Sequence, residues 1–267
     1  MPIFLRIIAA LLFVAISIGS TASSNVVTPE QSGIPILVYH RFGSRATDAM
    51  TMTTAGFEEQ MAWLKTHRYQ IIELRDLVEG LHNPAKRLPS HAVSITVDDG
   101  NESIYRELFP LIRRSHIPVT LFVYPSAISN AKYALTWDQL AEMKRTGLVD
   151  VQSHTWWHPN FNRERARLSQ DAYRAFVMTQ LLHSKELIHR HLGGNIDMLA
   201  WPYGIHDPEL QRWASGAGYV AAFTLVRRAA RRDDSLLALP RYLVTDRDRH
   251  AQFAAMIEGG VNRTGRP

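Results

Sequence analysis

The sequence has 267 residues, no cysteine and a formal net charge of +5, with 46% hydrophobic and 21% charged residues. This length favours one large domain, and this composition is that of an ordinary globular protein rather than of a disordered chain or a coiled coil. Without cysteine the chain has no disulfide framework, iron–sulfur cluster or cysteine nucleophile, so any bound metal must be held by His, Asp or Glu.

The first 22 residues are typical of a secretory signal peptide. Arg6 gives the positive start, residues 7–18 are apolar, and residues 20–22 are small, as a signal peptidase requires. The alternative is an uncleaved membrane anchor, but the apolar stretch is shorter than the roughly 20 residues that span a bilayer. We therefore expect cleavage after Ala22 and an exported chain with no stable membrane span, in the periplasm or at the cell exterior.

From residue 34 onward, short apolar runs alternate with helix-length amphipathic stretches. The apolar runs, each of strand length, are residues 34–39, 92–97, 119–123, 148–151, 197–200, 219–224 and 239–244. The helices are expected over 54–66, from a cap at Thr136 through Met143, over 163–191 and over 208–216. The alternation predicts an α/β domain over 34–259, a distorted (β/α) barrel of about seven parallel strands.

Polar side chains follow four of these predicted strands. His40 follows the first, Asp98 and Asp99 the second, His154 the fourth and the Trp201–Gly204 segment the fifth. Because the carboxyl ends of parallel strands share one face, we expect these groups to converge there.

Two of these segments could hold a metal, although each has an ordinary alternative. Asp98-Asp99-Gly100 could be only a turn, or one carboxylate could bind a metal while its neighbour faces a substrate. His154 and His158 are four residues apart, close enough for one ion if the segment forms a helical turn. A carboxylate and two imidazoles with open positions would make a catalytic rather than a closed structural site.

These segments resemble the motifs of the polysaccharide deacetylases, the NodB-type esterases of carbohydrate esterase family 4. Residues 93–100 resemble the first motif, residues 153–158 the second and residues 201–204 the third, and the resemblance extends over about 34–245. It implies that Asp99, His154 and His158 bind a divalent metal, that Asp98 is the general base, and that the backbone near Tyr203 holds the oxyanion. It further implies that Trp157, Trp201 and Tyr203 contact substrate. Zinc is the first choice of metal, with Ni²⁺, Co²⁺ or Fe²⁺ as alternatives.

The sequence departs from the family pattern in two places. The late Leu-x-His motif, whose histidine protonates the leaving amine, has no counterpart after Tyr219, whereas residues 37–40 end in His40. This arrangement resembles the circularly permuted branch that deacetylates poly-β-1,6-N-acetylglucosamine, so His40 is expected to be the acid. The third motif carries Ala200 where the family has an arginine. Arg241 is the candidate replacement that would keep Asp98 ionised; the alternative is an ordinary arginine at a strand end.

The resemblance predicts an exported, metal-dependent N-deacetylase of an N-acetylglucosamine polymer, with poly-N-acetylglucosamine as the first choice. The alternatives are a peptidoglycan or chitooligosaccharide deacetylase, an O-acetyl esterase of the same fold, and a non-catalytic polysaccharide-binding protein. The expected partner is the N-acetylated polysaccharide. Nucleic acid is not expected, because the 30 basic residues are scattered among 25 acidic ones. The sequence carries no indication of oligomeric state.

Overall fold

The computed structural model describes residues 33–262, so the predicted signal peptide lies outside the described residues. Each of the seven predicted apolar runs overlaps a strand of the main sheet, and three further strands are short. The strands are β1 (Ile36–Tyr39), β2 (Arg41–Gly43), β3 (Thr51–Thr53), β4 (Gln70–Ile71), β5 (Ala92–Asp99), β6 (Val119–Val123), β7 (Val149–Ser153), β8 (Met198–Ala200), β9 (Ala221–Phe223) and β10 (Tyr242–Leu243).

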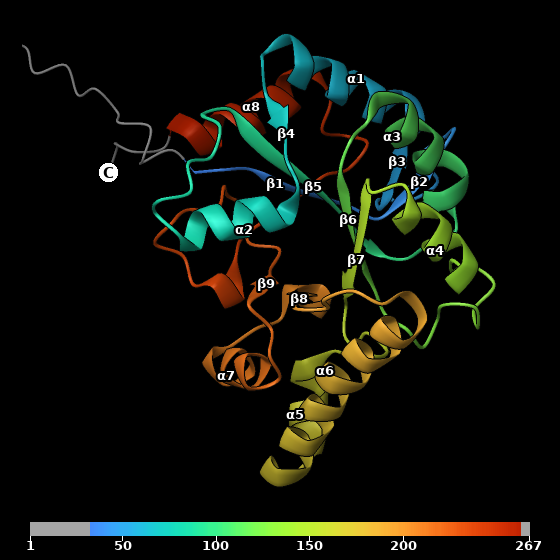
Figure 1. Cartoon of the computed structure of the whole chain (residues 1–267), viewed down its shortest axis with the longest axis vertical. Helices are drawn as coiled ribbons and strands as arrows, with labels where there is room; N and C mark the ends of the chain where they lie inside the picture. The colour runs from blue at the N-terminus through green and yellow to red at the C-terminus, as the bar shows by residue number, and fades with distance from the viewer. Residues whose placement is uncertain (1–32, 263–267) are drawn as a thin grey trace, which may run out of the picture.

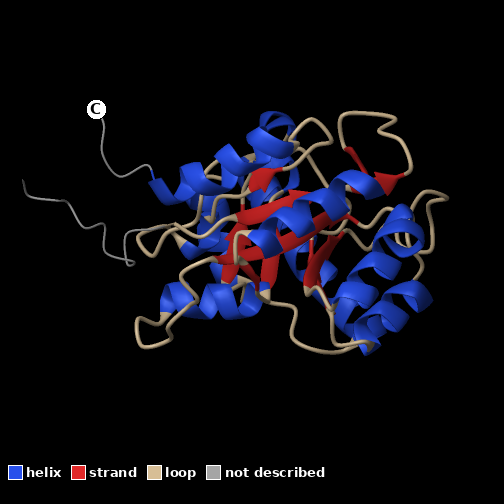
Figure 2. Ribbon diagram, turned by 90° about the horizontal axis from the view of Figure 1, so that it is seen from above, coloured by secondary structure: helices blue, strands red, loops and turns tan. Residues whose placement is uncertain are grey.

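Helices surround the main sheet, which lies in the interior of the molecule (Figure 2). The α-helices are α1 (Thr54–Thr66), α2 (Leu74–His82), α3 (Phe109–Ser115), α4 (Trp137–Arg145), α5 (Phe161–Arg167), α6 (Gln170–Leu192), α7 (Pro208–Gly216) and α8 (His250–Asn262). The shorter helices are η2 (Ile104–Leu108), η3 (Pro202–Gly204) and η4 (Leu236–Ala238). Among the described residues, no helix combines the length and the apolar character that crossing a bilayer requires.

The main sheet is parallel throughout and has the order β10-β1-β5-β6-β7-β8-β9, with β4 beside β5. It curls, and the segment leading into β10 links its two edges: Leu239 bridges to Phe223 of β9, whereas Tyr242 pairs with Leu37 of β1. All four residues of β1 are fully buried, as expected for a parallel strand covered on both faces. The predicted distorted barrel of about seven parallel strands is confirmed.

The helices show where local sequence decides the structure. Thr136 caps α4 with a capping box, and Leu140 and Met143 are buried as predicted. The single helical region predicted over 163–191 is wrong, because α5 and α6 are separate helices. Leu168 has extended backbone, and the Ser169 hydroxyl accepts a hydrogen bond from the amide of Ala172, so a new helix begins there.

Helix α6 lies beside the strand that leads to the predicted metal ligands. It packs against β7 and against α4, and it projects with α5 at one end of the molecule (Figure 1). The carboxyl end of β7 is therefore covered by a long helix of the same chain.

Candidate metal centre and catalytic site

Strand register brings the candidate side chains to one edge of the sheet. Asp99 of β5 lies opposite Val123 of β6, which lies opposite Ser153 of β7. Tyr39 of β1 lies opposite Val97, so His40 emerges beside Asp98. The expected convergence at the carboxyl ends of the strands therefore exists in the structure.

Asp99, His154 and His158 form a cluster with the geometry of a metal site. One ligand atom from each lies within 4.8 Å of the others. Nε2 of His154 is 3.6 Å and Nε2 of His158 is 3.8 Å from Oδ1 of Asp99. Ligand atoms at about 2.1 Å from one tetrahedral zinc ion stand about 3.4 Å apart, so the cluster fits such an ion with little movement.

Both imidazoles are prepared for ligation by their surroundings. Nδ1 of His154 donates to the carbonyl oxygen of Ala200 at 2.7 Å, which leaves Nε2 free to face Asp99. Burial, assisted by the nearby His154, lowers the pKa of His158 to about 4. His158 is therefore neutral near pH 7, and neutral imidazole is the form that binds metal.

The segment between the two histidines brings them together without the helical turn that was the stated condition for a shared ion. Thr155 has φ 65° and His158 has φ 61°, in the left-handed region. Asp99 (φ 75°) and Tyr203 (φ 57°) share this conformation, so four of the eight non-glycine residues with positive φ in residues 33–262 lie in this site. Such conformations are costly and cluster at functional sites, where the surrounding structure must enforce them.

Asp98 forms a buried ion pair with Arg241. Its two carboxylate oxygens accept from both terminal nitrogens of Arg241, at 2.8 and 2.7 Å. Arg241 is fully buried and also donates to Thr96 Oγ1 and to the carbonyl oxygen of Thr224. Burial by itself raises the pKa of Asp98, but the charges of Arg241 and His154 together with the Arg241 hydrogen bonds lower it to about 2.

The side chains of Asp98 and Asp99 have different surroundings because successive residues of a strand point to opposite faces of the sheet. Thr96 and Asp98 share one face of β5, and Arg241 binds both of them there. Asp99 ends the strand with positive φ and faces the imidazoles instead. Removing one partner of a buried ion pair costs about 3–5 kcal/mol, so Arg241 contributes to stability as well as to the charge of Asp98.

His40 belongs to the same cluster. Its Nδ1 is buried without a hydrogen-bond partner among the described residues. Burial lowers the pKa of His40, whereas the negative charges of Asp98 and Asp99 raise it. A buried, unpaired ring nitrogen is costly in a structural role, which indicates a function for this side chain.

Of the residues expected to contact substrate, Tyr203 and Trp157 are exposed and Trp201 is not. Tyr203 lies on the turn after β8, and its ring centroid is 4.5 Å from that of His158. Trp201 is fully buried, packs edge-on against Phe161 and donates to the carbonyl oxygen of Leu237. The expectation that Trp201 contacts substrate is therefore wrong, because its ring is part of the core beneath the turn.

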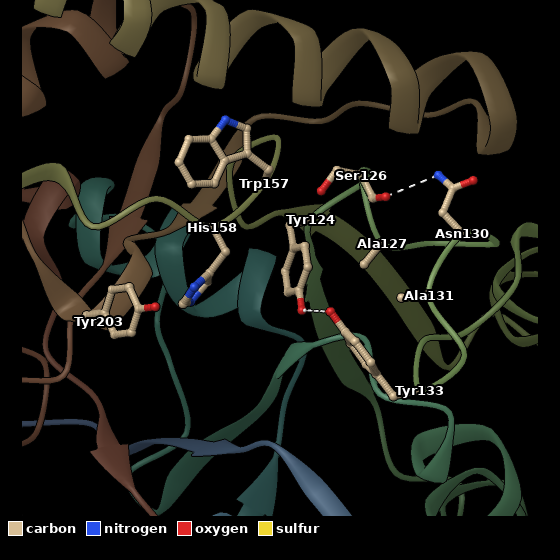
Figure 3. A pocket seen from close by; sticks show the side chains of 9 residues that line it. All are labelled: Tyr124, Ser126, Ala127, Asn130, Ala131, Tyr133, Trp157, His158 and Tyr203. Atoms are coloured by element: carbon tan, nitrogen blue, oxygen red, sulfur yellow. Dashed lines mark hydrogen bonds between the residues drawn. The ribbon is translucent and has the colours of Figure 1, made fainter. Parts of the chain in front are cut away.

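A pocket of about 470 Å³ opens beside His158 (Figure 3). Of the tyrosine, tryptophan and phenylalanine rings in residues 33–262, three are well exposed, and all three line this pocket: Tyr133, Trp157 and Tyr203. In Figure 3 the imidazole of His158 lies between the rings of Tyr203 and Tyr124. Exposed rings around a polar cluster are typical of a binding site.

Tyr124 and Tyr133 are lining residues that sequence reasoning missed. Their hydroxyl oxygens are 2.9 Å apart, and they come from the loop that follows β6. The argument from strand ends applies to this loop as well, because Tyr124 directly follows the predicted strand 119–123. Its position at a strand end is thus a sequence signal by which Tyr124 can be identified as a candidate pocket residue.

A curled parallel sheet with an aspartate–histidine cluster at its carboxyl edge is the architecture of an α/β protein with a place for a divalent ion. The chain belongs to the polysaccharide deacetylase family, whose model matches residues 85–222, just over half of its length. It is therefore a hydrolase of carbon–nitrogen bonds in a metal-dependent family. These findings confirm the predicted family and class of enzyme; the boundaries 1–22 and 34–259 stay predictions.

Two staphylococcal enzymes are similar in sequence to most of this chain. The poly-β-1,6-N-acetyl-D-glucosamine N-deacetylase of Staphylococcus epidermidis is 27% identical over 210 residues, covering 76% of this chain and 71% of that protein. The enzyme of the same name from Staphylococcus aureus is 23% identical over 213 residues, covering 78% of this chain and 73% of its own length.

Solved structures share the fold. The Streptococcus pyogenes deacetylase PplD, in complex with acetate, has a TM-score of 0.75 at 22% identity over 84% of this chain and 98% of that chain. IcaB from Ammonifex degensii has a TM-score of 0.75 at 24% identity, over 86% of this chain and 98% of that chain. Both likenesses support the barrel-like fold.

Proposed function

We propose that this polysaccharide deacetylase is an exported, zinc-dependent enzyme that removes N-acetyl groups from poly-β-1,6-N-acetylglucosamine. The observation that carries the proposal is the Asp99–His154–His158 cluster beside the buried Asp98–Arg241 pair, at the rim of an aromatic pocket. The products are acetate and a polymer with a free amine.

Asp99, His154 and His158 hold the metal in this proposal. A zinc ion there would polarise the acetamide carbonyl and lower the pKa of a bound water to about 7. Three protein ligands leave a coordination position for water or substrate, as in other catalytic zinc sites.

Asp98 accepts the proton from the attacking water. Its pKa of about 2 makes it a carboxylate at every physiological pH, so it is always able to accept. The same low pKa makes Asp98 a weak base, which would suffice for a water whose own pKa a bound metal lowers. Arg241 holds both carboxylate oxygens of Asp98 and so fixes the direction in which the proton is received.

His40 donates a proton to the leaving nitrogen. The carbon–nitrogen bond of the tetrahedral intermediate breaks readily only after its nitrogen has been protonated, so that a neutral amine leaves instead of an amide anion, and an acid is therefore required. A low pKa makes the His40 imidazolium a strong acid, and the carboxylates of Asp98 and Asp99 oppose the lowering. The backbone beside Tyr203, turned by its positive φ, offers a donor to the oxyanion.

The aromatic pocket contacts the sugar. The exposed rings of Trp157, Tyr203 and Tyr133 offer faces on which the apolar side of a pyranose ring can lie, next to His158. The names of the staphylococcal relatives support the β-1,6-linked polymer as the substrate. Export is supported by the residue pattern of positions 1–22.

The polymer is tested by acetate release. The zinc-loaded protein is given β-1,6-linked and β-1,4-linked N-acetylglucosamine oligomers of matched length, peptidoglycan, and an O-acetylated sugar. We expect the β-1,6 oligomers to give the highest kcat/KM. A higher kcat/KM on β-1,4 oligomers or on peptidoglycan would show that the β-1,6-linked polymer is not the preferred substrate. Acetate release from the O-acetylated sugar alone would identify an esterase.

A further inference from the structure

The loop that carries both imidazoles has backbone amides that no secondary structure satisfies. Side chains accept from them instead: Ser153 Oγ from the amide of Thr155 at 3.1 Å, and Thr155 Oγ1 from that of His158 at 3.3 Å. The amide of Trp157, next to the ligand His158, donates to Oε1 of Gln180 at 3.1 Å. Gln180 is therefore a side-chain acceptor from outside the loop; the amide of His154 has a backbone acceptor outside it, the carbonyl oxygen of Val123 at 2.8 Å.

Gln180 and Ser184 lie one turn apart on the face of α6 that meets this loop. Gln180 is 1% exposed and Ser184 is fully buried, although both are polar. The hydroxyl of Ser184 is 2.8 Å from that of Ser153, the residue before His154. Burying a polar side chain costs free energy unless it is hydrogen-bonded. Gln180 and Ser184 are satisfied by the Trp157 amide and the Ser153 hydroxyl, so their burial depends on this segment.

Aromatic contacts from the same helix flank this pair. His183 meets the ring of Trp156 edge-on at 4.8 Å, and Phe176 meets that of Trp157 at 5.8 Å. Helix α6 therefore contacts Ser153, Trp156 and Trp157, and two of these, Ser153 and Trp157, are adjacent in sequence to a proposed metal ligand. These contacts connect the loop to α6 at several points.

The restraint matters because the loop is strained. Thr155 and His158 both have positive φ, a conformation that is unfavourable for residues other than glycine unless the surrounding structure enforces it. If the Trp157 amide lost its acceptor, the backbone could relax from this conformation, and Nε2 of His158 would move away from Asp99.

We propose that Gln180, supported by Ser184, is a positioning residue that holds the His154–His158 loop in the geometry required for a divalent cation. This inference rests on the proposed metal site. Outer-shell partners of metal ligands typically change metal affinity by about 10–100-fold when they are mutated. Gln180 acts through the loop and touches neither the ion nor the substrate.

The test compares variants by metal binding and not by activity. Gln180→Met keeps the length of the side chain and removes the acceptor, whereas Gln180→Glu keeps an oxygen at that place. Thr179→Ala, at the neighbouring exposed position whose hydroxyl only bonds Ala175 of its own helix, is the matched control. The Kd for Zn²⁺ is measured by competition with a chelator, and the visible absorption of the Co²⁺-loaded protein reports the coordination geometry.

We expect Gln180→Met to raise the Kd about 10–100-fold and to change the Co²⁺ spectrum, and we expect Gln180→Glu to restore most of the affinity. Thr179→Ala should match the wild type. A wild-type Kd and spectrum in Gln180→Met would overturn the inference. If Gln180→Met does not fold, Ser184→Ala decides by the same readouts. A wild-type protein that binds no ion would instead contradict the metal site itself, before any variant is compared.

Discussion

Asp98→Asn should lower the rate of acetate release by about 10²–10⁴-fold while the protein keeps one metal ion per chain. The asparagine cannot accept the proton of the attacking water, but it leaves Asp99, His154 and His158 in place. The control is Asp99→Asn, which should lose metal and activity together. Metal content by elemental analysis and acetate release are measured on the same samples.

The buried Arg241 affects the stability of the Asp98→Asn variant, and its rate must be measured accordingly. In Asp98→Asn the guanidinium keeps a neutral oxygen acceptor but loses its counter-charge, so the variant should also be less stable. Rates are therefore compared at a temperature well below the Tm of the variant. Equal loss of metal in Asp98→Asn and Asp99→Asn would show that the two aspartates do not have separate roles.

His40→Ala should lose about 10²–10⁴-fold of its activity on acetamide substrates and keep most of its activity on activated acetate esters. An amine leaves slowly unless its nitrogen is protonated, whereas the leaving group of an activated ester needs little protonation. The zinc content should be unchanged, because His40 is not among the proposed ligands.

His82→Ala is a suitable control for this prediction, since His82 is exposed at the end of α2. It should behave as the wild type on both substrates. If His40→Ala lowers the rates on acetamides and esters to the same extent, His40 does not act as the acid, and the permuted arrangement of the catalytic groups is wrong.

Much of the sheet could be predicted from the sequence because parallel strands are buried on both faces. Such strands appear as short apolar runs, and polar residues at their ends then mark the carboxyl edge. The short strands β2 and β3 were not predicted, since runs of three residues carry too little pattern. Helix α2, with Leu74, Leu77 and Leu81 buried, was missed although its apolar residues have helical spacing.

The candidate site depends partly on contacts that the spacing of residues in the sequence does not predict. The pairing of Arg241 with Asp98 joins residues 143 positions apart and depends on the register of β10, β1 and β5, which no local pattern contains. The spacing of His154 and His158 indicated that they could share an ion if the segment formed a helical turn. Two left-handed residues and side-chain acceptors, rather than a helical turn, bring the imidazoles together.

The burial of the Trp201 ring could not be predicted from its place in the motif. Its place in a motif suggested contact with substrate, but the turn at Pro202 and Tyr203 exposes the tyrosine ring and leaves the tryptophan ring in the core. Which of two adjacent aromatic rings faces the pocket depends on backbone torsions at the turn. Those torsions follow from the packing of the whole edge and not from the motif alone.

A zinc titration of the metal-free protein tests the central claim most directly. The protein is stripped with a chelator, increasing amounts of Zn²⁺ are added back, and acetate release from β-1,6-linked N-acetylglucosamine oligomers is measured at each step. We expect negligible release without metal and a linear rise that ends at one ion per chain. Full acetate release by the metal-free protein, or a rise that continues well beyond one ion per chain, would contradict it.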